Sequence, residues 1–232
     1  MTDNDQPFNA RAIGERYLSI RERIWLAAQA QGRDPASVRL VAVTKTFAAE
    51  NILPVLLQGH RSFGENRVQE AMHKWPVLRE RFPDIELHLI GPLQSNKARE
   101  AVALFDCIET LDRPKLAAAL AAEIQRQGKA PKLLIQVNTG LEPQKAGVTP
   151  ADAPKFLEQC QREFGLAVSG LMCIPPLEDD PLSHFKTLAA LRDRLALSEL
   201  SMGMSADFEI AIRAGATMVR VGSAIFGSRR QS

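Results

Sequence analysis

The sequence predicts an α/β fold, in which a single (β/α)8 barrel of the TIM type follows one extra N-terminal helix. Short apolar, β-branched runs alternate with amphipathic segments along the chain, as expected for buried parallel strands and their covering helices. Roughly eight such alternations follow one another without a linker or a low-complexity break. A length of 232 residues is also common for this barrel. We therefore expect residues 1–232 to form one domain.

The expected elements follow one another in a regular order. An amphipathic helix at residues 13–31 precedes the first strand and stops near Gly32. Strands are expected at residues 40–45, 61–63, 86–90, 107–110, 132–137, 167–172, 199–201 and 217–221. Helices are expected at residues 49–58, 68–79, from 98 onward, 114–127, 151–164, 183–195 and 206–213.

The composition argues against several classes of function. The formal net charge is +2, and the basic residues are scattered apart from the terminal pair Arg229 and Arg230, so nucleic-acid binding is not expected. No apolar run is long enough to span a bilayer, and the start Met1–Asp5 lacks the basic and apolar regions of a secretion signal. We therefore expect a cytoplasmic protein that does not enter membranes.

The cysteines and histidines do not predict a metal site. Cys107, Cys160 and Cys173 lie far apart, and no CxxC or histidine-flanked spacing occurs. The four histidines are also isolated in sequence. We expect Cys107 and Cys173 to fill the core, because both lie in apolar, strand-like runs.

Lys45 is the first candidate for chemistry, because it ends the apolar run that is expected to form the first strand. The C-terminal ends of barrel strands carry the active sites of this fold. A lysine amine in partly apolar surroundings loses some of its positive charge and can attack an aldehyde. On this residue alone, a solvated lysine that caps a strand is the better interpretation.

The loops after the last two strands predict a phosphate site. Barrels often bind phosphate there with backbone N–H groups and the start of a short helix. Ser205 is expected to open the helix at residues 206–213, while Gly222 lets the backbone approach a ligand and Ser223 adds an amide and a hydroxyl. Each serine alone could instead be an ordinary helix cap or turn residue.

Arg220 lies inside the apolar strand expected at residues 217–221. If its side chain points into the barrel it needs an acceptor, because a buried unpaired guanidinium is very unfavourable. A ligand nitrogen or a carboxylate would serve. The side chain could also point outward toward a helix.

Five ordered segments resemble the pyridoxal phosphate homeostasis proteins. They are Val41–Lys45, Phe63–Glu70, Ile90–Lys97, Ser201–Asp207 and Val219–Gly227. The resemblance extends from about residue 13 to residue 229, nearly the whole chain. Two departures lie outside the cofactor segments: Leu87, where an aromatic residue is frequent, and Phe47, where a lysine is common.

The resemblance implies a barrel that binds pyridoxal 5'-phosphate, similar to the N-terminal domain of alanine racemase. Lys45 would form a Schiff base with this cofactor, and Arg220 would face its pyridine nitrogen. The remaining cofactor-binding positions would be Asn66, Met204, Ser205, Gly222 and Ser223, with Lys145 as a second lysine near the cofactor or simply a solvated loop residue. Because arginine does not readily give up its proton, the ring nitrogen would stay largely unprotonated and the ring would be a weak electron sink.

The resemblance leaves carrier and enzyme as alternatives. A racemase of this kind needs a second acid/base, supplied by a C-terminal β-domain and a partner subunit, whereas this sequence ends soon after the eighth expected strand. The only tyrosine, Tyr17, lies in the N-terminal helix. We therefore expect a monomeric, non-catalytic protein that buffers pyridoxal phosphate or delivers it to apoenzymes that use it. A weak amino-acid racemase is the second hypothesis, and a barrel isomerase acting on a phosphorylated sugar or indole precursor is the third.

Overall fold

The structure is a computed structural model that describes residues 9–227 of the chain. The N-terminal start Met1–Asp5 and the basic pair Arg229 and Arg230 lie outside the described residues. Within the described part, no helix is both long enough and apolar enough to cross a membrane.

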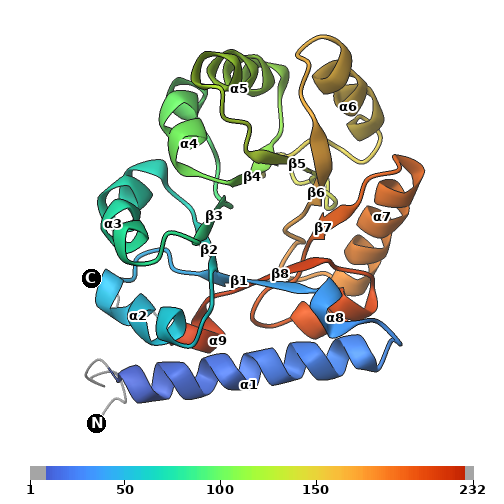
Figure 1. The fold of residues 1–232 in the computed structure, drawn as a ribbon. Coiled ribbons are helices and arrows are strands. Elements are labelled where there is room, and N and C mark those ends of the chain that lie inside the picture. Colours follow the sequence, from blue (N-terminus) through green and yellow to red (C-terminus); the bar gives the residue numbers. More distant parts are fainter. Residues whose placement is uncertain (1–8, 228–232) are drawn as a thin grey trace.

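A closed barrel of parallel strands forms the centre of the molecule (Figure 1). The strands are β1 (Arg39–Val43), β2 (Ser62–Glu65), β3 (Glu86–Leu89), β4 (Cys107–Leu111), β5 (Lys132–Gln136), β6 (Val168–Met172), β7 (Glu199–Ser201) and β8 (Met218–Val221). They neighbour one another in sequence order, and β8 closes the barrel by pairing with β1, where Val41 lies opposite Arg220. The predicted (β/α)8 barrel is confirmed.

Helices surround the barrel and shield the outer faces of the strands (Figure 1). They are α1 (Ala10–Gln29), α2 (Ala49–Leu57), α3 (Val68–Arg81), α4 (Ala98–Leu104), α5 (Pro114–Gln127), α6 (Ala153–Arg162), α7 (Pro181–Arg194), α8 (Phe208–Arg213) and α9 (Ser223–Phe226). The additional N-terminal helix is α1, which lies along α2, α8 and α9. Its buried stripe, formed by Ile13, Tyr17, Ile20, Ile24 and Ala28, repeats at the three- and four-residue spacing of an amphipathic helix.

Three local predictions need correction. Strand β1 ends at Val43, so Lys45 lies in the following turn and not in the strand. Strand β2 continues to Glu65, which was expected to be in a loop. Helix α8 begins at Phe208, later than expected, and the short helix α9 was not anticipated.

The core has two parts. The larger lies between the strands and the helices and contains most of the buried apolar side chains. A smaller cluster inside the barrel contains Cys107, Leu134, Met172 and Met218. Buried polar side chains share this interior, including those of His88, Glu109 and Arg220.

Candidate functional site

The C-terminal ends of the first and last strands meet at one side of the barrel mouth. Because β1 pairs with both β2 and β8, the segments that follow these strands lie beside one another. A Cβ atom on Gly222 would approach the Val43 carbonyl oxygen to 3.2 Å, so the loop after β8 runs directly against the end of β1. The structure therefore brings the Lys45 turn next to the Gly222 loop.

A largely buried lysine from α3, Lys74, holds the turn that carries Lys45. The Nζ atom of Lys74 donates hydrogen bonds to the backbone carbonyls of Thr44, at 2.8 Å, and Phe47, at 2.9 Å. Between them, Thr46 adopts a left-handed φ of 68°, which is uncommon for a β-branched residue, and its N–H donates to Glu70 Oε1 at 2.5 Å. The turn is thus fixed by side chains of α3 at both carbonyls and at its strained residue.

Lys74 has a buried counter-ion in Glu65, with Nζ 2.8 Å from Oε1. The same oxygen accepts hydrogen bonds from the Thr44 hydroxyl at 2.6 Å and from the Trp75 indole N–H at 3.1 Å. Burial raises the pKa of the Glu65 carboxyl, while Lys74 acts in the opposite direction. The sequence analysis missed this ion pair, because Glu65 was expected in a loop and Lys74 on an ordinary covering helix.

The loops after β7 and β8 meet at the Ser205 hydroxyl. Its Oγ lies 3.4 Å from both the Gly222 and the Ala224 backbone nitrogens, so two N–H groups point toward one place. Ser205 does not open α8, contrary to the prediction: Asp207 is the N-cap residue, and its carboxylate accepts the Met204 N–H at 2.6 Å. Ser223 begins α9 immediately beside this position.

These loops fit a phosphate group. Convergent backbone N–H groups and a hydroxyl are the donors that phosphate oxygens accept, and the loops after the last two strands are the usual phosphate position in this barrel. The close packing of the loop after β7 against α8 depends on glycine. Gly203 has a φ of 92°, and a Cβ there would lie 2.5 Å from that of Ala211.

Arg220 points into the barrel, which settles the choice that its sequence position left open. Its side chain is buried and donates to the Ser201 hydroxyl at 2.7 Å and to the Cys173 carbonyl at 2.8 Å. The Glu109 carboxylate lies 3.9 Å from the guanidinium. The buried positive charge of Arg220 therefore has a carboxylate beside it, as expected from its place in an apolar strand.

Asn66 follows β2 and lies against the loop after β3. A Cβ on Gly91 would come within 2.2 Å of the Asn66 carbonyl oxygen, so these two loops pack closely because residue 91 has no side chain. Val43 of β1 and Gly64 of β2 lie opposite each other in the sheet. Lys45 follows Val43 by two residues, and Asn66 follows Gly64 by two residues. The two predicted residues stand at equivalent levels on neighbouring strands.

Lys145 belongs to the long loop after β5. Its Nζ lies 2.5 Å from Glu142 Oε2 and donates to the Pro175 carbonyl at 3.2 Å. These contacts tie the loop after β5 to the loop after β6, so Lys145 is more than a solvated loop residue. Its expected approach to the cofactor remains a prediction.

The barrel interior holds a group of potential metal ligands that isolated sequence positions did not reveal. Ligand atoms of His88, Cys107 and Glu109 lie within 4.8 Å of one another, and all three residues are buried. They come from adjacent strands, so a sequence-local spacing such as CxxC could not indicate them. Both Glu109 oxygens already bond within the protein, to His88 and to Ser201, and we therefore describe the group as part of a hydrogen-bond network.

Tyr17 is remote from the barrel mouth. It is buried in α1, where its ring meets that of His60 with 5.3 Å between centroids. Both residues line a cavity of about 660 Å³ together with Arg39, Ser62 and Glu86, which stand at the starts of β1, β2 and β3. The only tyrosine of the chain therefore lies at the N-terminal end of the barrel, opposite the mouth.

Several known proteins are similar to this chain in sequence. The family described as alanine racemase, N-terminal domain, matches residues 20–230. Pyridoxal phosphate homeostasis proteins of Vibrio alginolyticus and Escherichia coli strain K12 are 44% and 38% identical to the chain. Both alignments cover 95% of this chain, and they cover 99% and 98% of the respective relatives.

Solved structures agree with the sequence comparison. PipY of Synechococcus elongatus PCC7942, solved without PLP, is 41% identical with a TM-score of 0.81, over 93% of this chain and 100% of PipY. A PipY structure with PLP bound has a TM-score of 0.80 at 40% identity, over the same shares of the two chains. An alanine racemase of Clostridium difficile, at 12% identity and a TM-score of 0.69 over 92% of this chain and 58% of its own, shares the fold alone. The chain belongs to the family of pyridoxal phosphate homeostasis proteins, whose barrel is that of the alanine racemase N-terminal domain.

Proposed function

We propose that this protein binds pyridoxal 5'-phosphate at the barrel mouth and serves as a non-catalytic carrier in the homeostasis of the cofactor, and thereby in amino-acid metabolism. The observation that carries the proposal is the adjacency of the Lys45 turn and the phosphate cradle, by which we mean Ser205 and the backbone N–H groups of Gly222 and Ala224. A lysine amine and a phosphate cradle side by side match the aldehyde and the phosphate of this molecule. Relatives named for this homeostasis, and the PLP-bound PipY structure, support the same assignment.

Each part of the site has a distinct role in this proposal. The cofactor supplies an aldehyde, with which Lys45 forms a Schiff base. Ser205, Gly222 and Ser223 hold the phosphate, with Met204 and Asn66 beside the cofactor. Arg220 faces the ring nitrogen and donates a hydrogen bond to it without giving up a proton, which keeps the ring a weak electron sink. Such a site favours holding the cofactor over reacting with it.

The position of Tyr17 supports a carrier more than a racemase. Two-base racemisation needs a second proton donor on the far side of the substrate. Tyr17 lies beneath the barrel against His60 and does not serve the mouth. Exchange of the α-proton of added amino acids in deuterated water, at useful turnover, would instead establish the racemase alternative.

The test is an absorbance titration of the purified protein with pyridoxal phosphate, followed by borohydride reduction and peptide mapping. We expect a yellow Schiff-base band and a reduced adduct on Lys45, both lost in Lys45→Ala. Lys145→Ala is the matched control and should retain the adduct. An adduct mainly on Lys145 or on exposed lysines would overturn the assignment of Lys45.

The proposal extends to the setting in which the protein acts. We place it in the cytoplasm as a monomer that passes the cofactor to pyridoxal phosphate-dependent apoenzymes. Transfer is measured as recovery of activity when the loaded protein is mixed with an apoenzyme, compared with the same concentration of free cofactor. Light scattering on the eluting protein measures the oligomeric state, and a dimer mass would contradict the monomer.

A further inference from the structure

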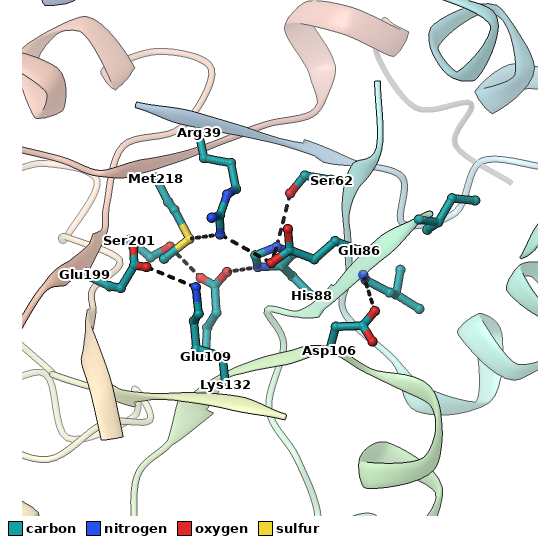
Figure 2. A network of polar contacts seen from close by, with 12 residues as sticks. Arg39, Ser62, Glu86, His88, Asp106, Glu109, Lys132, Glu199, Ser201 and Met218 are labelled. Carbon is teal, nitrogen blue, oxygen red and sulfur yellow. Dashed lines mark hydrogen bonds and ion pairs between the residues drawn. The ribbon is translucent and has the colours of Figure 1, made fainter. Parts of the chain in front are cut away.

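A continuous line of polar side chains runs through the barrel interior to Arg220. At its beginning, the Glu86 carboxylate lies 3.3 Å from Arg39 and 3.6 Å from His88 Nε2 (Figure 2). His88 Nδ1 lies 2.8 Å from Glu109 Oε1, and the other Glu109 oxygen accepts the Ser201 hydroxyl. The Ser201 oxygen in turn accepts from Arg220 at 2.7 Å.

Chemistry fixes the direction of the hydrogen bonds at the Arg220 end. A guanidinium only donates, so Ser201 must accept from Arg220. The single Ser201 proton is then directed to Glu109, because an ionised carboxylate only accepts. Glu109 Oε1 consequently accepts the Nδ1–H of His88. The hydroxyl of Ser201 therefore has one orientation that satisfies both neighbours, and it links Arg220 to Glu109.

The charged side chains of this line also compensate one another in the buried interior of the barrel. Glu109 and His88 are fully buried, and Arg220 is 3% exposed. Burial acts to lower the pKa of His88, but Cys107, Glu109 and Glu86 outweigh it and raise the pKa above its usual value. The pKa of Glu109 is lowered, because His88, Arg220 and Ser201 together outweigh the effect of burial. Glu109 thus lies as a carboxylate between the His88 ring and the Arg220 guanidinium.

We propose that Glu109 and Ser201 are positioning residues for Arg220, holding its guanidinium at the ring nitrogen of bound pyridoxal phosphate. Anchoring is needed because a long arginine side chain has many rotamers, and fixing it before binding removes that entropy loss from the binding step. Ser201 and the Cys173 carbonyl fix two of its nitrogens, and Glu109 supplies the counter-charge. This inference rests on the proposed function, which supplies the ligand.

The test uses pyridoxal phosphate labelled with ¹⁵N in the ring. The ¹⁵N chemical shift of the bound cofactor reports the hydrogen bond at that nitrogen, independently of any activity. The Arg220→Met variant gives the reference shift of a Lys45 Schiff base without the arginine contact. We expect Ser201→Ala and Glu109→Gln to move the shift toward this reference. We also expect affinity to fall by roughly 10- to 100-fold, the effect of losing a hydrogen bond to a charged group. Ser201→Thr retains the hydroxyl and should restore the wild-type shift.

Glu199→Gln is the matched control for Glu109→Gln. Glu199 is also a carboxylate on a barrel strand, but it pairs with Lys132, at 3.0 Å, and not with His88 or Arg220 (Figure 2). It should leave the ¹⁵N shift unchanged. Ser201→Ala removes one oxygen atom only, so the test still decides if Glu109→Gln fails to fold.

The outcomes separate the two proposals. Without a Schiff-base band in the wild-type protein, the proposed function fails. A normal band with a wild-type ¹⁵N shift in folded Ser201→Ala overturns the positioning role alone. An equal change of shift in Ser201→Ala and Ser201→Thr would also overturn it, because the hydroxyl would then not be the determining group.

Discussion

The turn that carries Lys45 depends on a second lysine, Lys74, which extends to it from α3. Lys74 bonds both carbonyls that flank the Lys45–Thr46 turn and neutralises the buried Glu65. Its side chain is only 8% exposed, so few water molecules could replace it. A turn with a left-handed Thr46 persists because the surrounding contacts overcome its strain.

We expect Lys74→Met to lower the free energy of unfolding by about 3–5 kcal/mol, because it leaves the carboxylate of Glu65 buried without its cation. It should also reduce the fraction of Lys45 that forms a Schiff base at a fixed cofactor concentration. Urea denaturation measures the first effect and the absorbance band the second. The double variant Lys74→Met/Glu65→Gln should recover part of the stability but not the fixed turn.

Lys129→Met provides the control for this prediction. Lys129 also bonds a backbone carbonyl, that of Ala103, and pairs with Asp106 at 3.7 Å, but it is 37% exposed. Partly exposed pairs of this kind contribute about 1 kcal/mol or less. Equal losses of stability in Lys129→Met and Lys74→Met would show that burial of the Lys74 pair is not what matters.

Among the elements, the short helix α9 joins the proposed phosphate cradle to two other parts of the molecule. Its Phe226 ring packs on Phe47, just after the Lys45 turn, with 5.2 Å between centroids. Arg16 of α1 donates to the Ile225 carbonyl at 2.7 Å. The N-terminal helix therefore supports the helix whose first residues form the cradle, and Phe47 connects that cradle to the lysine.

Arg16→Met should weaken pyridoxal phosphate binding by about 3- to 10-fold. A hydrogen bond from a charged donor contributes about 1.5–3 kcal/mol. We expect its removal to make the backbone N–H groups of the cradle less fixed, so that part of this free energy is lost from cofactor binding. Titration of the Schiff-base band gives the affinity. Arg23→Met is the control, because Arg23 extends from the same helix to Glu209 of α8 at 3.0 Å in an exposed ion pair. Identical affinities for Arg16→Met and wild type would contradict support through α1.

For the whole molecule, barrel closure decides where the site forms. The pairing of β1 with β8 places residues near 45 beside residues near 222, although most of the sequence separates them. The closed barrel also buries Glu109 and Arg220 together, so that each side chain is the counter-charge of the other. Cofactor binding, stability and interior charge are therefore properties of one closed structure.

Acid should destabilise this structure through His60 at the N-terminal end. Burial lowers the pKa of His60 to about 4, and Arg21 and Arg61 act in the same direction. The unfolded chain binds this proton near the usual value of 6.5, so His60 favours folding above that pH. Proton binding to the unfolded chain therefore destabilises the fold as the pH falls from about 6.5 to about 4, by roughly 3 kcal/mol.

Urea denaturation between pH 4 and pH 7 measures this contribution. We expect His60→Gln to flatten the dependence of the unfolding free energy on pH within that window. His73→Gln is the control and should keep the wild-type slope, because His73 is exposed on α3. Parallel curves for wild type and His60→Gln would exclude His60 as the group responsible.

The sequence by itself determined the barrel, the order of its elements and the main residues of the mouth. Strand periodicity and the position of strand ends are local properties of a chain, so Lys45, Gly222 and Ser223 could be placed before any contact was known. The extra N-terminal helix could be identified for the same reason, because its apolar stripe repeats along one segment.

Only the tertiary structure decided how the site is supported. The direction of Arg220, the contacts of Lys74 with the Lys45 turn and the line from Glu86 to Arg220 all depend on contacts between distant segments. His88, Glu109 and Ser201 look like ordinary strand residues in sequence, because nothing local indicates that their side chains share a closed interior. Burial and pairing with remote charges determine what these polar groups do, and both arise only when the barrel closes.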